Sequence, residues 1–146
     1  MTNEALLIID YTNDFVDDKG ALTCGKPAQE LDDAITNLAD EFLKEGKWVI
    51  FPTDKHFKDD PYHPETKLFP PHNLPNTWGR ELYGKVGKWY EDHKDNDHVI
   101  LMDKTRYSAF CGYASWSNFA WVEDRYLTLD RCLHRHLCSA HGNGRV

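Results

Sequence analysis

A group of acidic and histidine side chains in the middle of the sequence has the residue types that bind divalent metals. Asp54 and His56 follow a short apolar run and are separated by one residue, so their side chains point the same way in extended backbone. His63, Glu65 and His72 come soon after. Imidazole nitrogens and carboxylate oxygens suit Zn²⁺ and similar ions. By spacing alone, a metal site and a set of solvated polar side chains are equally good interpretations.

Two charged residues elsewhere in the chain also follow apolar runs. Asp10 comes directly after the first run, and Lys104 comes shortly after the last. Taken singly, Asp10 is better explained as the cap of a turn or helix, and Lys104 as a surface lysine. Their shared position with the Asp54 group, at the ends of apolar runs, favours one common site.

These groups need a scaffold that brings the ends of the apolar runs together. Continuous apolar runs predict buried strands at residues 5–9, 48–51 and 98–102. Helical spacing predicts one helix from Pro27 to Gly46. The stretch Pro52–Asp97 is long and polar, which is typical of a functional connection. The alternation predicts an α/β fold with a parallel sheet, where ligands bind beyond the carboxyl ends of the strands.

Composition limits the class of partner. The chain has 146 residues, of which 40% are hydrophobic and 28% charged, as expected for one soluble globular domain. A net charge of -7 argues against nucleic acid, because phosphate binding needs clustered Lys and Arg. No apolar run is long enough for a membrane span. We therefore expect a cytoplasmic protein with a small neutral or cationic partner, and the irregularly spaced cysteines predict no disulfide framework.

Four motifs in a fixed order give the sequence a specific resemblance. They are Leu7–Phe15, Thr53–His56, His63–Asn73 and Lys104–Phe110. From about Ala5 to Gly112 the chain resembles the isochorismatase-like cysteine hydrolases, and within them the nicotinamidases. The resemblance implies a Rossmann-like three-layer α/β fold with a parallel sheet, incomplete in this chain. Because family members are often homo-oligomers, it also implies self-association.

The resemblance implies a role for each candidate residue. Asp10 would be the base that takes a thiol proton, and Lys104 the cation that holds Asp10 and the thiolate in register. A divalent metal, with Zn²⁺ as the expected ion, would hold the pyridine nitrogen of nicotinamide. The implied metal ligands are Asp54, His56, Glu65 and His72. Phe15 and Tyr107 would flank the substrate ring, or else be ordinary core residues.

The nucleophile that this chemistry requires is missing from its expected place. The family has a strand and then a Cys in a T-D-I-C-V type motif, whereas the chain after Gly112 contains no aliphatic run of strand length. If the encoding is read one nucleotide later, the string TGVCTDICVLHTA is permitted at every step from the Asp130–Arg131 junction onward. We therefore predict a single-nucleotide frameshift near Gly112–Tyr113, in the gene or its sequencing, followed by premature termination. Residues 1–112 would be hydrolase domain, and residues 113–146 an out-of-frame tail.

Two classes of function are compatible with this sequence. The first is a nicotinamidase-like amidohydrolase, which converts nicotinamide and water to nicotinate and ammonia in NAD salvage and is impaired as written. The second is a noncatalytic, truncated metal-binding fragment. Within the first class, another amide or isochorismate hydrolase of the family is the alternative, and the metal set favours nicotinamide.

The remaining features of the tail are interpreted as incidental. Cys138 lies at a suitable distance after Lys104 but lacks a preceding strand, and Cys111 is too close to Lys104 in sequence. The Cys and His residues between Cys132 and His141 fit no zinc-finger spacing. A parallel sheet without its later strands leaves an edge and a helix face uncovered, so we expect poor stability or aggregation. A cooperative thermal transition of normal size would contradict this.

Overall fold

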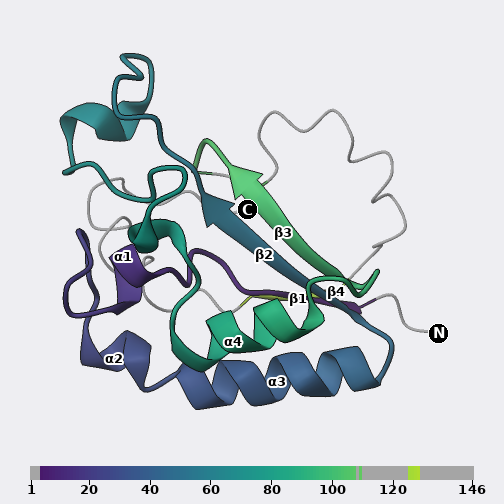
Figure 1. Ribbon diagram of the computed structural model, residues 1–146. Helices are drawn as coiled ribbons and strands as arrows, with labels where there is room; N and C mark the ends of the chain where they lie inside the picture. The colour runs from purple at the N-terminus through teal and green to yellow at the C-terminus, as the bar shows by residue number, and fades with distance from the viewer. Residues whose placement is uncertain (1–3, 108, 110–124, 129–146) are drawn as a thin grey trace.

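The computed structural model describes residues 4–107, 109 and 125–128. Strands and helices alternate along most of this part of the chain (Figure 1). The elements are β1 (Glu4–Leu7), α1 (Asn13–Val16), α2 (Lys26–Gln29), α3 (Asp32–Lys44), β2 (Trp48–Asp54), the 3₁₀ helices η1 (Pro64–Lys67) and η2 (Trp78–Arg80), α4 (Gly84–His93), β3 (Val99–Lys104) and β4 (Arg125–Thr128). Within the described ranges, no helix has the length and apolar character needed to cross a membrane.

The described strands form one parallel sheet in the order β3-β2-β1-β4. Leu7 lies opposite Ile50 on β2 and opposite Thr128 on β4. At the other edge, Asp54 at the end of β2 lies opposite Lys104 at the end of β3. The predicted α/β fold with a parallel sheet is therefore confirmed.

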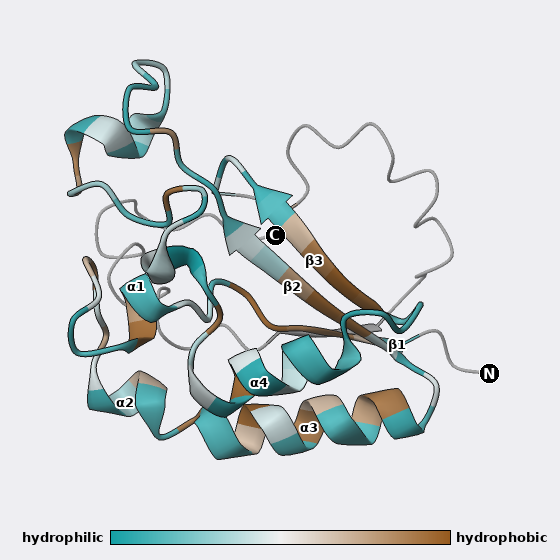
Figure 2. Cartoon of the chain, viewed as in Figure 1, coloured by the Kyte–Doolittle hydropathy of each residue, from teal (hydrophilic) through white to brown (hydrophobic). Residues whose placement is uncertain are grey.

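The core lies between this sheet and the helices α3 and α4, which cover one of its faces (Figure 1). Leu6 and Phe51 are fully buried and belong to the same cluster as Ile35 of α3 and Val86 of α4. Brown, apolar residues fill much of β2 and β3, and both strands turn polar towards their carboxyl ends (Figure 2). The apolar cluster of Ala5, Leu7 and Ile50 includes no residue of a described helix, so the second helical layer of the three-layer prediction is not tested by the described part of the chain.

Three sequence predictions need correction in their details. The helix predicted from Pro27 to Gly46 is two helices, α2 and α3, because the chain turns between Gln29 and Asp32. The stretch Pro52–Asp97 is not an irregular connection throughout, since it contains the end of β2 together with η1, η2 and α4. The strands β2 and β3 also run further than their apolar cores, because backbone pairing continues through Asp54 and Lys104.

The segment after Gly112 contains a strand, although no aliphatic run of strand length occurs there. Arg125–Thr128 forms β4 and pairs in parallel with β1 along the side that β2 leaves free. Backbone groups make the ladder, and they do not require an aliphatic run. This edge of β1 is therefore not uncovered. The remaining predictions for the tail, including those for Cys132, Cys138 and His141, fall on residues outside the described ranges.

Candidate active site

The site lies where the carboxyl ends of β1, β2 and β3 meet. Asp54 and Lys104 are the last residues of β2 and β3 and lie opposite each other in the ladder. Asp10 comes three residues after β1 and has a positive φ of 55°. Its backbone N–H donates to the Pro52 carbonyl at 3.0 Å, which brings the loop after β1 alongside β2. The predicted convergence of these three segments is confirmed in the geometry.

Lys104 bridges the two carboxylates at the centre of this site. Its Nζ lies 2.9 Å from Asp10 Oδ2 and donates a hydrogen bond to Asp54 Oδ1. Asp10 Oδ1 also accepts from the Asp54 backbone N–H at 2.8 Å. All three side chains are buried. Asp10 is therefore neither a helix cap nor a solvated carboxylate, and Lys104 is not a surface lysine.

Burial dominates the proton affinity of Asp10. It raises the pKa of this carboxyl to about 7, and the nearby Asp54 charge adds to the effect, while Lys104 opposes both. Burial likewise raises the pKa of Asp54 against the influence of Lys104. For Lys104, burial works against the charged form, but the two carboxylates outweigh it and raise the pKa. Asp10 thus takes up and releases a proton near neutral pH.

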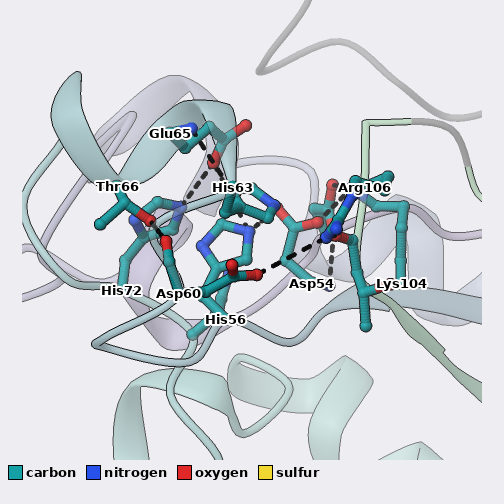
Figure 3. A network of polar contacts seen from close by, with 12 residues as sticks. Asp54, His56, Asp60, His63, Glu65, Thr66, His72, Lys104 and Arg106 are labelled. Carbon is teal, nitrogen blue, oxygen red and sulfur yellow. Dashed lines mark hydrogen bonds and ion pairs between the residues drawn. The ribbon is translucent and has the colours of Figure 1, made fainter.

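The four predicted metal ligands come together beside Lys104 (Figure 3). Each offers a ligand atom, and these atoms of Asp54, His56, Glu65 and His72 all lie within 4.8 Å of one another. Glu65 Oε2 is 3.3 Å from His72 Nε2 and 3.5 Å from His56 Nε2. Asp54 Oδ2 is 3.8 Å from His56 Nε2. All four residues are buried, so the interpretation as solvated polar side chains is wrong.

Local structure fixes the orientation of these ligands. Glu65 lies on η1, which is capped by His63: Nδ1 of His63 accepts from the Glu65 backbone N–H at 3.2 Å. His72 Nδ1 lies 2.9 Å from the Pro70 carbonyl, which leaves Nε2 to face Glu65. His63 is buried next to His56, with ring centroids 4.4 Å apart, but it does not belong to the set of four.

The donor set suits a zinc-like ion. Tetrahedral ligation at about 2.0–2.1 Å separates neighbouring ligand atoms by about 3.3 Å, close to the shortest separations in this cluster. Burial lowers the pKa of His56 to about 4, and this keeps its ring neutral, the form that binds metals. For Glu65, burial favours the neutral form, but the hydrogen bond from His72 and the histidine charges lower the pKa. Glu65 is therefore available as a carboxylate and His56 as a neutral imidazole. For His72, burial works against the charged form, but the hydrogen bonds to Glu65 and to the Pro70 carbonyl raise the pKa.

Each of the two aromatic candidates contacts a member of the ligand set. Phe15 is a buried core residue, and its ring packs edge-on against His72 with centroids 5.4 Å apart. Tyr107 is half exposed. Burial, the charge of Glu65 and a hydrogen bond to Glu65 raise the pKa of the Tyr107 hydroxyl. The alternative prediction, that both are ordinary core residues, therefore fits the position of Phe15 but not that of Tyr107.

Sequence reasoning missed a set of charged residues that contact the ends of β2 and β3 next to the site. Arg80 donates through Nε to the Asp54 carbonyl at 2.9 Å and pairs with Asp103 at 2.5 Å. Asp103 also pairs with Lys55 at 2.5 Å. In the D-K sequences at 54–55 and 103–104, neighbouring charged side chains point to opposite faces of the paired strands. This alternation is the sequence signal that would have indicated a second network, made of Lys55, Asp103 and Arg80, on the other face.

Among the described residues, no cysteine lies at the Asp10–Lys104 pair. Cys24 is the one cysteine within these ranges, and it packs against the hydrophobic core between α1 and α2. Cys111, Cys132 and Cys138 are outside the described residues.

The fold and this site define a parallel α/β protein with a buried acid–lysine pair and a metal-type ligand set at the carboxyl edge of its sheet. The chain belongs to the isochorismatase family, because the isochorismatase domain model matches residues 4–117. It is 51% identical over 109 residues to the isochorismatase family protein PncA of Bacillus subtilis (strain 168). This match covers 75% of the chain and 60% of the relative, so the chain spans about three-fifths of that protein.

Solved structures agree with this assignment. The crystal structure of nicotinamidase/pyrazinamidase PncA from Bacillus subtilis superposes with a TM-score of 0.81 at 43% identity, covering 94% of this chain and 78% of that one. The pyrazinamidase/nicotinamidase from Streptococcus mutans UA159 gives a TM-score of 0.81 at 39% identity, covering 94% of this chain and 79% of that one. The chain is therefore close in fold and sequence to nicotinamidase and pyrazinamidase structures.

Proposed function

We propose that this site belongs to a nicotinamidase-type amidohydrolase that releases ammonia from a small heteroaromatic carboxamide. One observation carries the proposal: Asp54, a member of the ligand set, also binds Lys104 of the Asp10–Lys104 pair. Its Oδ1 binds Lys104, and its Oδ2 faces His56 at 3.8 Å. A substrate held by the ligand set would therefore lie next to Asp10. The similarity to nicotinamidase/pyrazinamidase structures supports the same activity.

Asp10 and Lys104 are proposed to move and hold charge in this reaction. Asp10, with a pKa of about 7, takes the proton of a cysteine thiol and later delivers it to the departing ammonia. Lys104 holds Asp10 and the thiolate in register. The thiolate forms a C–S bond to the carboxamide carbon, the C–N bond breaks, and backbone N–H groups stabilise the oxyanion. Water then cleaves the thioester to give the carboxylate and return the thiol.

The metal ligands in this proposal are Asp54, His56, Glu65 and His72. A zinc ion bound there would act as a Lewis acid that holds the ring nitrogen of nicotinamide and so orients the carboxamide. Phe15 and Tyr107 would flank the ring, since flat aromatic faces suit an aromatic substrate. The ligand set favours nicotinamide over isochorismate, which has no ring nitrogen to bind.

We also propose that the reading frame changes near Gly112–Tyr113, so that the nucleophile is encoded but not translated in the chain as written. The isochorismatase domain match stops at residue 117, and the match to the Bacillus subtilis relative covers 109 residues. In the shifted frame the nucleophilic Cys falls across the codons of Leu137 and Cys138. Resequencing the DNA from the codon of Phe110 to that of Arg125 tests this proposal directly.

A second candidate function applies to the chain as written. The described residues hold a complete ligand set but no cysteine at Asp10 and Lys104. Because the sequence as written has no Cys in a T-D-I-C-V type motif, we propose a noncatalytic metal-binding protein as the alternative for this reading frame.

Ammonia release from nicotinamide distinguishes the two candidates. We expect no turnover by the chain as written and turnover by the protein with the shifted frame. Asp10→Asn in the shifted-frame protein should abolish it, whereas Asp33→Asn, an exposed change in α3, should not. Metal-dependent turnover by the chain as written would contradict the frame proposal and point to Cys138. If neither the chain as written nor the shifted-frame protein releases ammonia, the proposed activity is contradicted.

A further inference from the structure

Asn73, which follows His72, is completely buried and held by contacts on several sides. Its φ of 46° is in the left-handed region, which a residue other than glycine keeps only when its surroundings fix it. Its carbonyl accepts from the His56 backbone N–H at 3.2 Å. Its own backbone N–H donates to Asp14 Oδ2 at 2.7 Å. Asn73 is thus joined to one predicted ligand by a peptide bond and to another by a hydrogen bond.

The side chain of Asn73 is held by Thr12, which lies 61 residues earlier in the sequence. Thr12 Oγ1 donates to Asn73 Oδ1 at 2.8 Å, and both residues are fully buried. Thr12 is the cap residue of α1, yet its hydroxyl makes no capping hydrogen bond. The hydroxyl is therefore used for Asn73 and not for the helix.

A second contact comes from the same helix. The Asp14 carboxylate that accepts from the Asn73 N–H also accepts from the Ala21 N–H at 3.1 Å through its other oxygen. The start of α1 therefore binds Asn73 at two points: Thr12 binds the Asn73 side chain, and Asp14 binds the Asn73 backbone. The Asn73 amide nitrogen is buried without a hydrogen-bond partner among the described residues, so within these ranges the amide oxygen is the part of the side chain that is held.

We propose that Thr12 and Asn73 are positioning residues for the metal-ligand set, with the Thr12–Asn73 hydrogen bond fixing where His56 and His72 lie. The proposal rests on the proposed function in that the set binds a divalent metal. A displacement of Asn73 moves two of the four ligands at once, because one is its neighbour in the chain and the other bonds its carbonyl. Loss of the Thr12 hydroxyl leaves a buried amide oxygen unsatisfied, and this favours such a displacement.

Zn²⁺ and Co²⁺ titrations of the full chain against a competing chelator test this proposal. Thr12→Val removes the hydroxyl at nearly constant volume and should weaken metal binding about tenfold or more, within the range typical of groups that orient metal ligands. It should also shift the Co²⁺ absorption spectrum. Thr12→Ser keeps the hydroxyl and should stay close to the unaltered chain in both readouts. Asn73→Gly keeps the left-handed backbone without the side chain and should weaken binding as Thr12→Val does.

Two controls separate the possible outcomes. Thr36→Val removes a hydroxyl hydrogen bond within α3, away from the site, and should leave metal affinity unchanged. His56→Ala removes a predicted ligand and should lose more affinity than Thr12→Val. If Thr12→Val and Asn73→Gly lower only the unfolding temperature, with affinity and spectrum unchanged, the positioning role is wrong. If Thr12→Val does not fold, the metal affinity of Asn73→Gly tests the positioning role instead: unchanged affinity would contradict it. If the unaltered chain binds neither ion, the proposed metal set fails, and the positioning role fails with it.

Discussion

Lys104 makes the two halves of the site depend on each other at the scale of single residues. It binds Asp10 of the acid–lysine pair and Asp54 of the ligand set with one ammonium group. Because all three groups are buried, removal of one charge leaves the others poorly compensated. Lys104 and any metal bound beside it compete for the Asp54 carboxylate, so proton affinity at Asp10 and metal binding at His56 are expected to be coupled.

The raised pKa of Asp10 predicts how stability varies with pH. The ordinary pKa is 3.8 and the folded value is about 7, so between these values the folded protein retains a proton that the unfolded chain has lost. The contribution of Asp10 to the free energy of unfolding therefore falls as pH rises from about 4 to about 7. Urea unfolding of metal-free protein and of Asp10→Asn should show a difference in stability that decreases over this range. A difference that stays constant or grows would contradict the raised pKa.

At the scale of elements, α4 depends on a residue far from it in sequence. Asp32, the first residue of α3, accepts from the backbone N–H groups of Lys85 and Val86 at 2.8 and 3.2 Å. It therefore satisfies donors at the start of α4 that have no partner within the helix. Gly84 has a φ of 57° and approaches the Asp32 carboxylate so closely that a side chain would collide with it.

This contact predicts a specific loss of stability. Asp32→Ala leaves the first N–H groups of α4 without their acceptor and should lower the free energy of unfolding by about 1 kcal/mol, as for loss of an N-terminal cap. The matched control is Asp33→Ala, which removes the neighbouring exposed carboxylate that pairs with Lys85 at the surface and should change stability much less. Equal losses in urea unfolding would show that Asp32 acts as a general surface charge.

The elements that sequence reasoning found are those with local signals. The strands around Leu6, Val49 and Ile100 follow from continuous apolar runs, and the ligand set follows from residue type and motif order. The helix α4 was missed because its glycines weaken the local pattern and its cap comes from Asp32. The Thr12–Asn73 contact has no local signal either, since the two residues meet only once the loops after β1 and β2 are packed.

At the scale of the whole molecule, the described site is built from segments that lie far apart in the sequence. The loop after β1, the ends of β2 and β3, and the polar segment around η1 meet at one edge of the sheet (Figure 1). The strand β4 pairs with β1 on the side opposite to β2, and its carboxyl end lies at the same edge of the sheet. In a parallel sheet, residues that follow such a strand can contribute to a site at this edge. We therefore expect the proposed nucleophile to follow a strand in this position.

The most direct measurement compares ammonia release from nicotinamide and from benzamide by the zinc-loaded, shifted-frame protein. Benzamide has the same carboxamide but lacks the ring nitrogen that the ligand set is proposed to hold. We predict much faster release from nicotinamide, and loss of this preference in His56→Ala and His72→Ala but not in His93→Ala, which changes a histidine on α4. Equal rates on the two amides, or a preference that survives loss of both ligands, would contradict a metal-oriented amidohydrolase.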